Sequence, residues 1–335
     1  MPIRWMKGIS LLLLWGVLSG MALAQEQDNG WSQFKQRYVL PEGRVVDTGN
    51  NNISHTEGQG FTLLLAVFND DRTTFDRLWR WTKNTLYQPE SGLFCWRYDP
   101  AAKEKVTDKN NASDGDTLIA WALLLAADKW QTPEYRVESR QIQAALIKHT
   151  VVAFAGYQVM LPGMNGFNHT DSVNLNPSYF LFPAWQAFYR DSRLKVWSDL
   201  QQDALRLLSR MNFGQPPLPA DWVTLNTDGK MTPADGWPPR FSFDAVRIPL
   251  YLRWARIDGR AMAPFRLYWQ RFMREKTPAW VNVTTGEQAE YPLTGGMMAI
   301  RDITLGQDKL VSDRLLVEED YYSASLHLLA WWAIR

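Results

Sequence analysis

Apolar residues recur at helical spacing along almost the whole chain, and this periodicity constrains the fold more than any other feature. The pattern predicts about twelve helices, over residues 31–38, 57–68, 71–86, 118–130, 137–154, 178–189, 194–211, 241–254, 261–273, 287–300, 305–317 and 321–334. Six helix pairs can close into a toroid with an inner and an outer ring. An α-solenoid is the alternative, but a solenoid needs a repeated sequence, and we find none. We therefore predict an all-α toroid with long loops and minor β-structure.

The N-terminal residues have the pattern of a secretory signal. Basic residues precede an apolar stretch over 9–18, and Ala22-Leu23-Ala24 supplies the small residues of a cleavage site. We predict a signal peptide over 1–24 and a single domain over 25–335, secreted or periplasmic. No other segment approaches the roughly 20 apolar residues that a membrane span needs, so we expect no membrane association after the signal is removed.

The charge balance excludes partners that need a strong electrostatic field. The chain has 36 basic and 35 acidic residues and a net charge of +1, which leaves no basic surface for nucleic acid and no polybasic tail for a membrane. The 17 tryptophans are the compositional outlier. We expect most of them in the core, because large aromatic side chains are usually buried, and the others as stacking platforms for flat ligands such as sugar rings.

Residues that bind metals are few and scattered. Cys95 is the single cysteine, which excludes an internal disulfide and a cysteine-based metal site. The four histidines, His55, His149, His169 and His327, do not have the spacing of a ligand pair. We predict no metal and no cofactor.

One carboxylate stands where a loop enters the first strongly apolar helix, in the stretch His55-Thr56-Glu57-Gly58-Gln59-Gly60-Phe61. Gly58 and Gly60 directly after Glu57 let other groups approach closely, and rigid scaffolds often carry their chemistry at such junctions. The alternative is a first-turn glutamate that the helix dipole favours. The segment alone supports both interpretations.

Two other carboxylate clusters have the same ambiguity. Asp114 and Asp116 directly precede an apolar helix, where Ser113 or Asp114 would serve as a cap and Asp116 would favour the dipole. The functional alternative aims a carboxylate into a pocket. Asp244 and Arg247 are three residues apart within apolar flanks, which indicates a partly buried pair. An arginine keeps its neighbouring carboxylate ionised, as a general base requires.

Four segments, in order along most of the chain, resemble glycoside hydrolase family 8. Residues 112–130 (ASDGDTLIAWALLLAADKW) resemble the family signature along their whole length. Thr56-Glu57-Gly58-Gln59-Gly60 resembles its S/T-E-G-Q segment, Asn176-Pro177-Ser178-Tyr179 its N-P-S-Y segment, and SFDAVR at 242–247 its S-[YF]-D-A-x-R segment. Within the family, the chain is most similar to secreted or periplasmic endoglucanases of Gram-negative bacteria, including those of cellulose synthase operons.

This resemblance implies an (α/α)6 barrel, in agreement with the helix count, and an inverting endo-hydrolase of β-1,4-glucan. It places the general acid on Glu57, the general base on Asp244, and the carboxylate that holds the sugar at the cleavage subsite on Asp114. Further implied substrate contacts are Arg247 beside the base, the cleft aromatics Trp96 and Tyr179, and cleft tyrosines at Tyr321 or Tyr322. The implied partner is a β-glucan bound by a monomer, and a link to cellulose synthase machinery stays open.

Two departures from the family pattern concern subsite affinity more than the reaction. Relatives often have a tryptophan shortly before N-P-S-Y, where this chain has Val173-Asn174-Leu175, and the usual S/T-S/T-E is here His55-Thr56-Glu57.

The mechanism that the resemblance implies requires a protonated Glu57, whose pKa is raised through burial or nearby Asp114, and an ionised Asp244. An inverting pair is separated by roughly 6.5–9.5 Å, which leaves room for a water.

Three alternatives remain at this stage. The same fold can act on chitosan, xylan or mixed-linkage glucan, although chitosan favours a more acidic cleft than this balanced charge suggests. A non-catalytic glucan-binding protein would share the signal and the aromatic excess, but it would not need four charged residues of the reaction together. A polysaccharide lyase on a similar toroid would favour a basic cleft.

Overall fold

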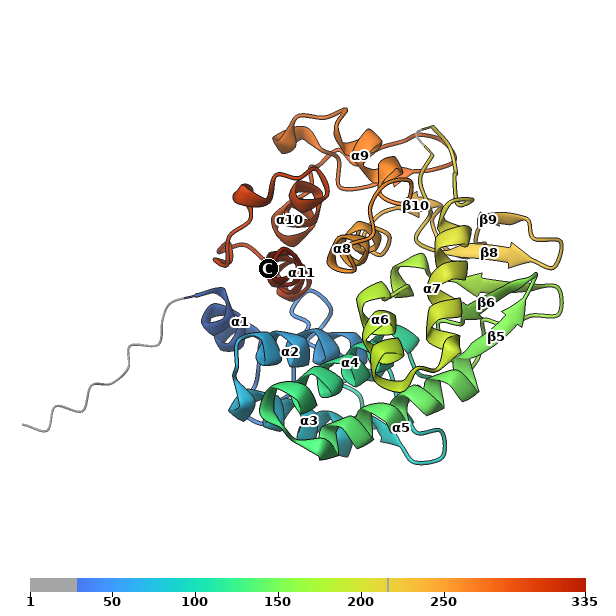
Figure 1. Ribbon diagram of the computed structural model, residues 1–335. Coiled ribbons are helices and arrows are strands. Elements are labelled where there is room, and N and C mark those ends of the chain that lie inside the picture. Colours follow the sequence, from blue (N-terminus) through green and yellow to red (C-terminus); the bar gives the residue numbers. More distant parts are fainter. Residues whose placement is uncertain (1–28, 216) are drawn as a thin grey trace, which may run out of the picture.

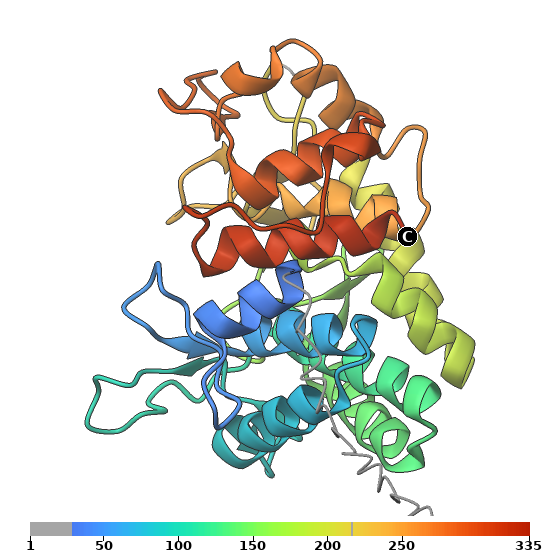
Figure 2. The ribbon, with the colours of Figure 1, turned by 90° about the vertical axis from the view of Figure 1, so that its left-hand side faces the viewer.

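The computed structural model describes residues 29–215 and 217–335, so the predicted signal peptide lies outside the described residues. The described chain is mainly helical (Figures 1 and 2), which confirms the all-α prediction. Its α-helices are α1 (Gly30–Tyr38), α2 (Thr56–Phe68), α3 (Arg72–Leu86), α4 (Ser113–Trp130), α5 (Pro133–Thr150), α6 (Phe182–Ser192), α7 (Lys195–Leu208), α8 (Arg247–Trp254), α9 (Ala263–Trp269), α10 (Gly295–Thr304) and α11 (Tyr321–Ala333).

The strands are short, antiparallel and confined to the connections between helices. They are β1 (Ser54–His55) with β4 (Arg97–Tyr98), β2 (Tyr87–Gln88) with β3 (Leu93–Phe94), β5 (Val151–Phe154) with β6 (Tyr157–Met160), β10 (Arg240–Phe241) with β11 (Val281–Asn282), and a sheet of β7 (Ser172–Leu175), β8 (Val223–Asn226) and β9 (Met231–Pro233). The β1–β4 pair matters most for function, because β1 leads directly into α2.

Six of the helices form a closed ring of contacts. Along the ring, α2 packs on α4, α4 on α6, α6 on α8, α8 on α10, α10 on α11, and α11 on α2. The helices α1, α3, α5, α7 and α9 each pack on a ring member, and Figure 1 shows α3, α5, α7 and α9 at the periphery. These peripheral helices bury one face; in α3 the buried residues are Thr74, Phe75, Leu78, Trp79, Thr82 and Leu86.

One predicted helix does not form. Over 305–317 the chain has only the short 3₁₀ turn Asp308–Leu310, so that prediction is wrong. Gly306 has a φ of +72°, a left-handed conformation typical of a helix end. Farther along, two backbone N–H groups donate to side chains and not to helical carbonyl oxygens. Leu315 N–H donates to Gln33 Oε1 (3.2 Å), and Leu316 N–H donates to Glu319 Oε2 (2.8 Å). A non-helical segment therefore covers α10 and α11.

Three helices begin several residues later than the periodicity predicts; one is α6, which starts at Phe182 and not at residue 178. The predicted helix over 137–154 ends early, because residues 151–154 form β5. The two larger delays are in α10 and α8. Residues 287–294 are extended, with Pro278 paired to Pro292 and Val281 to Gln288, and α10 starts only at Gly295. Residues 242–246 form turns before α8 starts at Arg247. In both places side-chain periodicity continued through segments whose backbone is held by other parts of the chain.

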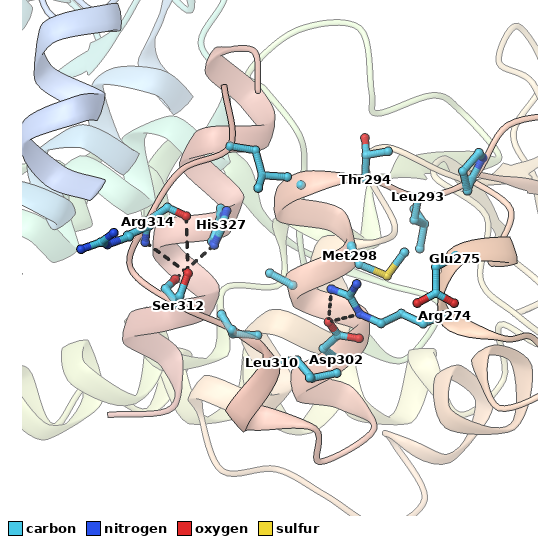
Figure 3. Close-up of a pocket in the computed structure, with 15 residues that line it drawn as sticks. Arg274, Glu275, Leu293, Thr294, Met298, Asp302, Leu310, Ser312, Arg314 and His327 are labelled. Atoms are coloured by element: carbon cyan, nitrogen blue, oxygen red, sulfur yellow. Dashed lines mark hydrogen bonds and ion pairs between the residues drawn. The ribbon is translucent and has the colours of Figure 1, made fainter. Parts of the chain in front are cut away.

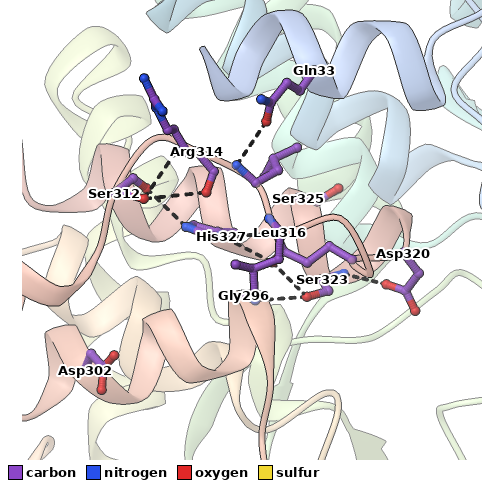
Figure 4. A network of polar contacts seen from close by, with 12 residues as sticks. Gln33, Gly296, Asp302, Ser312, Arg314, Leu316, Asp320, Ser323, Ser325 and His327 are labelled. Atoms are coloured by element: carbon purple, nitrogen blue, oxygen red, sulfur yellow. Dashed lines mark hydrogen bonds and ion pairs between the residues drawn. The ribbon is translucent and has the colours of Figure 1, made fainter. Parts of the chain in front are cut away.

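His327 of α11 anchors the 305–320 segment (Figure 4). Its Nδ1 lies 3.0 Å from Glu319 Oε1, and its Nε2 lies 3.1 Å from the carbonyl oxygen of Ser312. Beneath the segment lies a cavity of about 370 Å³ (Figure 3), with an apolar wall that includes Leu293 and Met298. None of the predicted site residues lines this cavity.

The tryptophans of the described residues fall into three sets. Six are buried in the core: Trp31, Trp79, Trp121, Trp185, Trp197 and Trp269. Six more are partly buried and pack against it: Trp81, Trp130, Trp254, Trp280, Trp331 and Trp332. Twelve of the fifteen are thus in the core or packed against it. The remaining three, Trp96, Trp222 and Trp237, belong to neither set and lie near the predicted site.

Candidate active site

Glu57 is the second residue of α2, at the end of the ring where α2 and α4 begin. A Cβ at Gly60 would lie 2.5 Å from the Cβ of Leu118, and one at Gly115 would lie 2.1 Å from Thr56 Oγ1. Only glycine allows this approach of the two helices. The close packing brings the first turns of α2 and α4, and with them Glu57 and Asp114, to the same small cavity of about 190 Å³.

Asp114 is buried and is not a helix cap. Its Oδ1 accepts from the N–H of Gly115 (2.7 Å), while Oδ2 has no hydrogen-bond partner among the described residues. Ala112 occupies the N-cap position without a side-chain bond, and Ser113 Oγ donates to the carbonyl of Leu161. Neither Ser113 nor Asp114 is therefore the N-cap residue, although Asp114 does accept from a free amide of the first turn. Burial raises the pKa of Asp114 to about 7.

Asp116 has a structural role on the other side of the same turn. Its two oxygens accept from the N–H of Phe94 (3.1 Å) and from Asn111 Nδ2 (2.8 Å). Burial raises its pKa to about 8. Asp116 ties the β2–β3 hairpin to α4, and it does not line the cavity that Glu57 and Asp114 share.

Asp244 lies in the turn that precedes α8. Asp221 holds this turn, since its Oδ1 accepts from the N–H groups of Ser242 (2.9 Å) and Ala245 (2.8 Å). Asp244 Oδ2 accepts from Asn176 Nδ2 (3.1 Å), and its side chain keeps 34% of its surface exposed. Partial burial, followed by the like charge of Asp221, raises the pKa of Asp244 to about 8.

Arg247 links the three carboxylates. Its Nη1 donates to Glu57 Oε2 and lies 3.8 Å from Asp114 Oδ2, and its Nη2 donates to Asp244 Oδ1 (2.9 Å). The side chain is 1% exposed and also donates to Ser178 Oγ (2.8 Å). A buried cation favours the charged form of a neighbouring carboxylate, but here three carboxylates share the single guanidinium of Arg247. The cluster therefore retains protons at neutral pH, in line with the raised pKa values of Asp114 and Asp244.

The Asp244–Arg247 pair follows the predicted i, i+3 spacing, whereas the bond from Arg247 to Glu57 has no signal in the local sequence. Glu57 has no cation near it along the chain, yet its carboxylate is paired in space. The side chain of Glu57 is 17% exposed. Pairing with Arg247 therefore does not by itself distinguish the acid from the base.

Of the four predicted aromatic contacts, two line the cavity. Trp96 and Tyr179 do so together with Glu57 and Asp114. Tyr322 lies beside the cluster: the Cζ of Arg247 is 5.9 Å from its ring, and its hydroxyl donates to the carbonyl of Phe243 (2.5 Å). Tyr321 is 1% exposed and lies behind α2, so it does not line the cavity. A direct sugar contact for Tyr321 and for Tyr322 stays a prediction.

Sequence reasoning missed a second group of residues beside Asp244. The rings of Phe167 and Trp237 stack on either side of Trp222, at centroid distances of 5.7 and 4.5 Å. Trp222 is a hydrogen-bond partner of Asp244 and lies edge-on to Tyr179 at 6.2 Å. The signal was the density of Trp and Pro over 213–239, but that composition gave no partner for any ring.

Nothing in the described residues is arranged for a metal. No group of three or more His, Cys, Asp or Glu side chains in residues 29–215 and 217–335 has a geometry that could hold an ion. Cys95 is buried. No helix in the described part of the chain has the length and apolar character of a membrane span.

Comparison with known proteins gives a consistent result. A family model described as glycosyl hydrolases family 8 matches residues 3–333. An endoglucanase of Cellulomonas uda is 54% identical over 83% of this chain and 77% of that protein. The crystal structure of an endoglucanase from Klebsiella pneumoniae, a family 8 glycosyl hydrolase, is 54% identical with a TM-score of 0.89, over 91% of this chain and 98% of that chain. An endo-β-1,4-glucanase from an Achatina fulica gut metagenomic library is 52% identical with a TM-score of 0.90, over 92% and 98%.

Proposed function

Because the chain belongs to glycosyl hydrolases family 8, we propose that it hydrolyses internal β-1,4-glucosidic bonds in cellulose or related β-glucans. The observation that carries this proposal is that Glu57, Asp114 and Asp244 gather around Arg247, beside the partly exposed rings of Trp96 and Tyr179. Two carboxyl groups that flank a scissile bond are what glycoside hydrolysis requires. Relatives that share about half of the residues bear the name endoglucanase.

The proposed architecture is an (α/α)6 barrel. The ring α2, α4, α6, α8, α10 and α11 supplies six inner helices, and α1, α3, α5, α7 and α9 supply five outer ones. The 305–320 segment takes the place of the sixth outer helix. The first turns of α2 and α4 and the turn before α8 then meet at one end of the ring, where the three carboxylates lie.

Glu57 is the proposed general acid, which protonates the leaving glycosidic oxygen. Asp244 is the proposed general base, which removes a proton from water on the opposite face of the sugar. This assignment makes the reaction inverting, and it requires a carboxyl separation of roughly 6.5–9.5 Å. The larger exposed fraction of Asp244, 34% against 17% for Glu57, suits the group that meets the water.

A general base must be ionised, and the raised pKa of Asp244 opposes this. In the free cleft its pKa is about 8, so it holds a proton at neutral pH, while Glu57 is paired with Arg247. The productive form has the proton on Glu57 instead. These two forms have the same total charge, so substrate binding needs only to move one proton within the coupled cluster. A base with a raised pKa is also stronger once it is ionised.

Asp114 and the aromatic rings have supporting roles in this proposal. Asp114 Oδ2 is buried and lacks a hydrogen-bond donor, so a sugar hydroxyl at the cleavage subsite would satisfy it. Trp96 and Tyr179 would stack on glucose rings, which an endo-acting cleft must hold on both sides of the bond. The balanced net charge favours neutral glucan over cationic chitosan.

The remaining proposals concern the setting of the reaction. We place the mature chain outside the cytoplasm, after cleavage following residue 24, and expect it to act as a monomer on soluble or disordered chains. The decisive experiment compares sugar release from carboxymethyl cellulose, mixed-linkage glucan, xylan and chitosan. Cleavage of carboxymethyl cellulose with a rapid fall in viscosity supports an endoglucanase. Cleavage of only xylan or chitosan would move the activity to another substrate, and no release from any polymer would favour a binding protein.

A further inference from the structure

His55 is the N-cap of α2, directly before the two residues that lead to Gly58. Its backbone is extended (φ −142°, ψ 159°), and its Nδ1 lies 3.1 Å from the N–H of Gly58. Serine, threonine, asparagine or aspartate usually fills this position. Because a backbone N–H can only donate, Nδ1 must accept and therefore carries no proton.

The second ring nitrogen of His55 identifies the tautomer. Nε2 lies 3.2 Å from Asp47 Oδ2, which accepts, so the proton of the neutral ring is on Nε2. The ring also packs edge-on against Tyr321, with centroids 5.6 Å apart. At Gly58 a Cβ would lie 2.4 Å from the Tyr321 hydroxyl and 3.4 Å from His55 Cε1. The first turn of α2 thus rests directly on His55 and Tyr321.

We infer that His55 is a positioning residue: as a neutral imidazole it holds the first turn of α2, and with it the Glu57 carboxyl, in place against Arg247 and Asp114. His55 lines the same cavity as Glu57 and Asp114. It acts through the backbone of α2 and requires no contact with the reacting atoms. This inference rests on the proposed function for its effect on turnover, but not for the tautomer of the ring.

Protonation of His55 would release this turn. A proton on Nδ1 would face the Gly58 N–H, which removes the cap, and the new positive charge would lie at the positive end of the helix dipole. Four groups face the ring: Asp47 from the 45–53 segment, Asp114 from α4, Tyr321 from α11 and Glu57 of α2 itself. On the backbone side, Arg97 of β4 pairs with His55.

The first test reads the tautomer without any activity. The chain has four histidines, so a long-range ¹⁵N–¹H spectrum of the histidine-labelled protein can be assigned by the loss of one pattern in His55→Ser. At pH 7.5 we expect the His55 pattern of a ring protonated on Nε2 alone. A ring protonated on Nδ1, or on both nitrogens at this pH, would overturn the inference whether or not the protein cleaves glucan.

The second test uses turnover of a soluble cello-oligosaccharide by His55→Ala, His55→Ser and His55→Asn, with His149→Gln in α5 as the control. We expect His55→Ala to lower kcat by about 10- to 100-fold with little change in KM, because a small displacement of a catalytic group costs that much. Serine and asparagine can accept from Gly58 without titrating, so they should recover most of the loss. At pH 7.5 the wild type should therefore have the highest kcat, the serine and asparagine variants a slightly lower one, and His55→Ala the lowest.

A wild-type kcat in His55→Ala, or serine and asparagine variants no more active than the alanine variant, would overturn the positioning role. If His55→Ala does not fold, a 10-fold or larger loss of kcat in the folded serine and asparagine variants would overturn it instead. If the wild type cleaves no glucan, the proposed function fails, and the tautomer measurement still decides whether His55 caps α2 as a neutral ring.

Discussion

Arg247 donates through one terminal nitrogen to Glu57 Oε2 and through the other to Asp244 Oδ1, the latter at 2.9 Å. Because Glu57 and Asp244 are 187 positions apart in the sequence, only the closed ring of helices brings them to one guanidinium. A single buried cation thus fixes the relative position of the two proposed catalytic carboxyls. Any account of the reaction must explain how a proton is divided between them.

Replacement of Glu57 by glutamine tests the general acid. The amide keeps the shape of the carboxyl but cannot protonate the leaving oxygen, so we expect kcat on soluble cellulose derivatives to fall by about 10²–10⁴-fold, while oligosaccharide binding persists. Titration calorimetry measures the binding and a reducing-sugar assay the turnover. Glu290→Gln, an exposed change, is the matched control. Near-normal turnover by Glu57→Gln would remove Glu57 from the acid role.

The pH profile tests the shared proton. Burial raises the pKa of Asp114 to about 7 and that of Asp244 to about 8, so these two aspartates lose their protons in this range as the pH rises. The proposed reaction needs one proton, on Glu57. We therefore expect kcat/KM to be bell-shaped, falling as pH drops through about 7 and as it rises through about 8. A flat profile from pH 5 to 9 is incompatible with a shared proton.

Replacement of Asp221 by asparagine tests what raises the pKa of Asp244. Burial is the larger cause and the like charge of Asp221 the second. An amide retains the oxygen that accepts from Ser242 and Ala245 but removes the charge. The pKa of Asp244 should fall, so the alkaline limb of kcat/KM should move to lower pH. An unchanged alkaline limb in a protein with wild-type thermal stability would mean that Asp221 does not tune the base.

Replacement of Trp96 by alanine tests the aromatic platform. Loss of one stacking face should raise KM for cello-oligosaccharides by roughly 3- to 10-fold and leave kcat nearly unchanged. Trp331→Ala is the control, because Trp331 packs partly buried against the core and does not line the cavity with Glu57. Initial rates over a range of cellohexaose concentrations separate the two constants. An equal loss in both variants would indicate an effect on the fold and not on sugar binding.

Replacement of Asp116 by alanine tests the structural role of that carboxyl. The change leaves the Phe94 N–H and Asn111 Nδ2 without acceptors in a buried place. We expect the free energy of unfolding to fall by about 2–4 kcal/mol, measured by urea denaturation at pH 6. Asp171→Ala, at an exposed position, should change it by less than about 0.5 kcal/mol. Equal midpoints for the two variants would contradict the assignment.

Local patterns predicted much of this molecule. The 3.6-residue periodicity located most of the helices, and the resemblance to family 8 selected Glu57, Asp114, Asp244 and Arg247, which the structure brings together. The helix that periodicity predicts over 305–317 does not form, because the side chains of Gln33 and Glu319 accept hydrogen bonds from that backbone. Periodicity could not distinguish a helix from a segment that merely buries residues at helical spacing.

The parts of the site that were not predicted depend on contacts between distant segments. Asp221 belongs to no motif, and Asn176 belongs to the N-P-S-Y segment without a predicted role, yet each bonds to the turn that carries Asp244. The bond from Arg247 to Glu57 spans 190 positions. Spacing along the chain reports only neighbours three or four residues away, so these partners follow from the closure of the ring and from no local signal.

The stereochemistry of the first product tests the central claim most directly. The wild type is mixed with cellopentaose, and ¹H NMR records the anomeric protons before mutarotation. Glu57 as acid and Asp244 as base, on opposite faces of a β-1,4-glucan, predict that the new reducing end appears first as the α-anomer. A β-anomer as the first product would show that the configuration is retained, and it would contradict the proposed roles of both carboxyls.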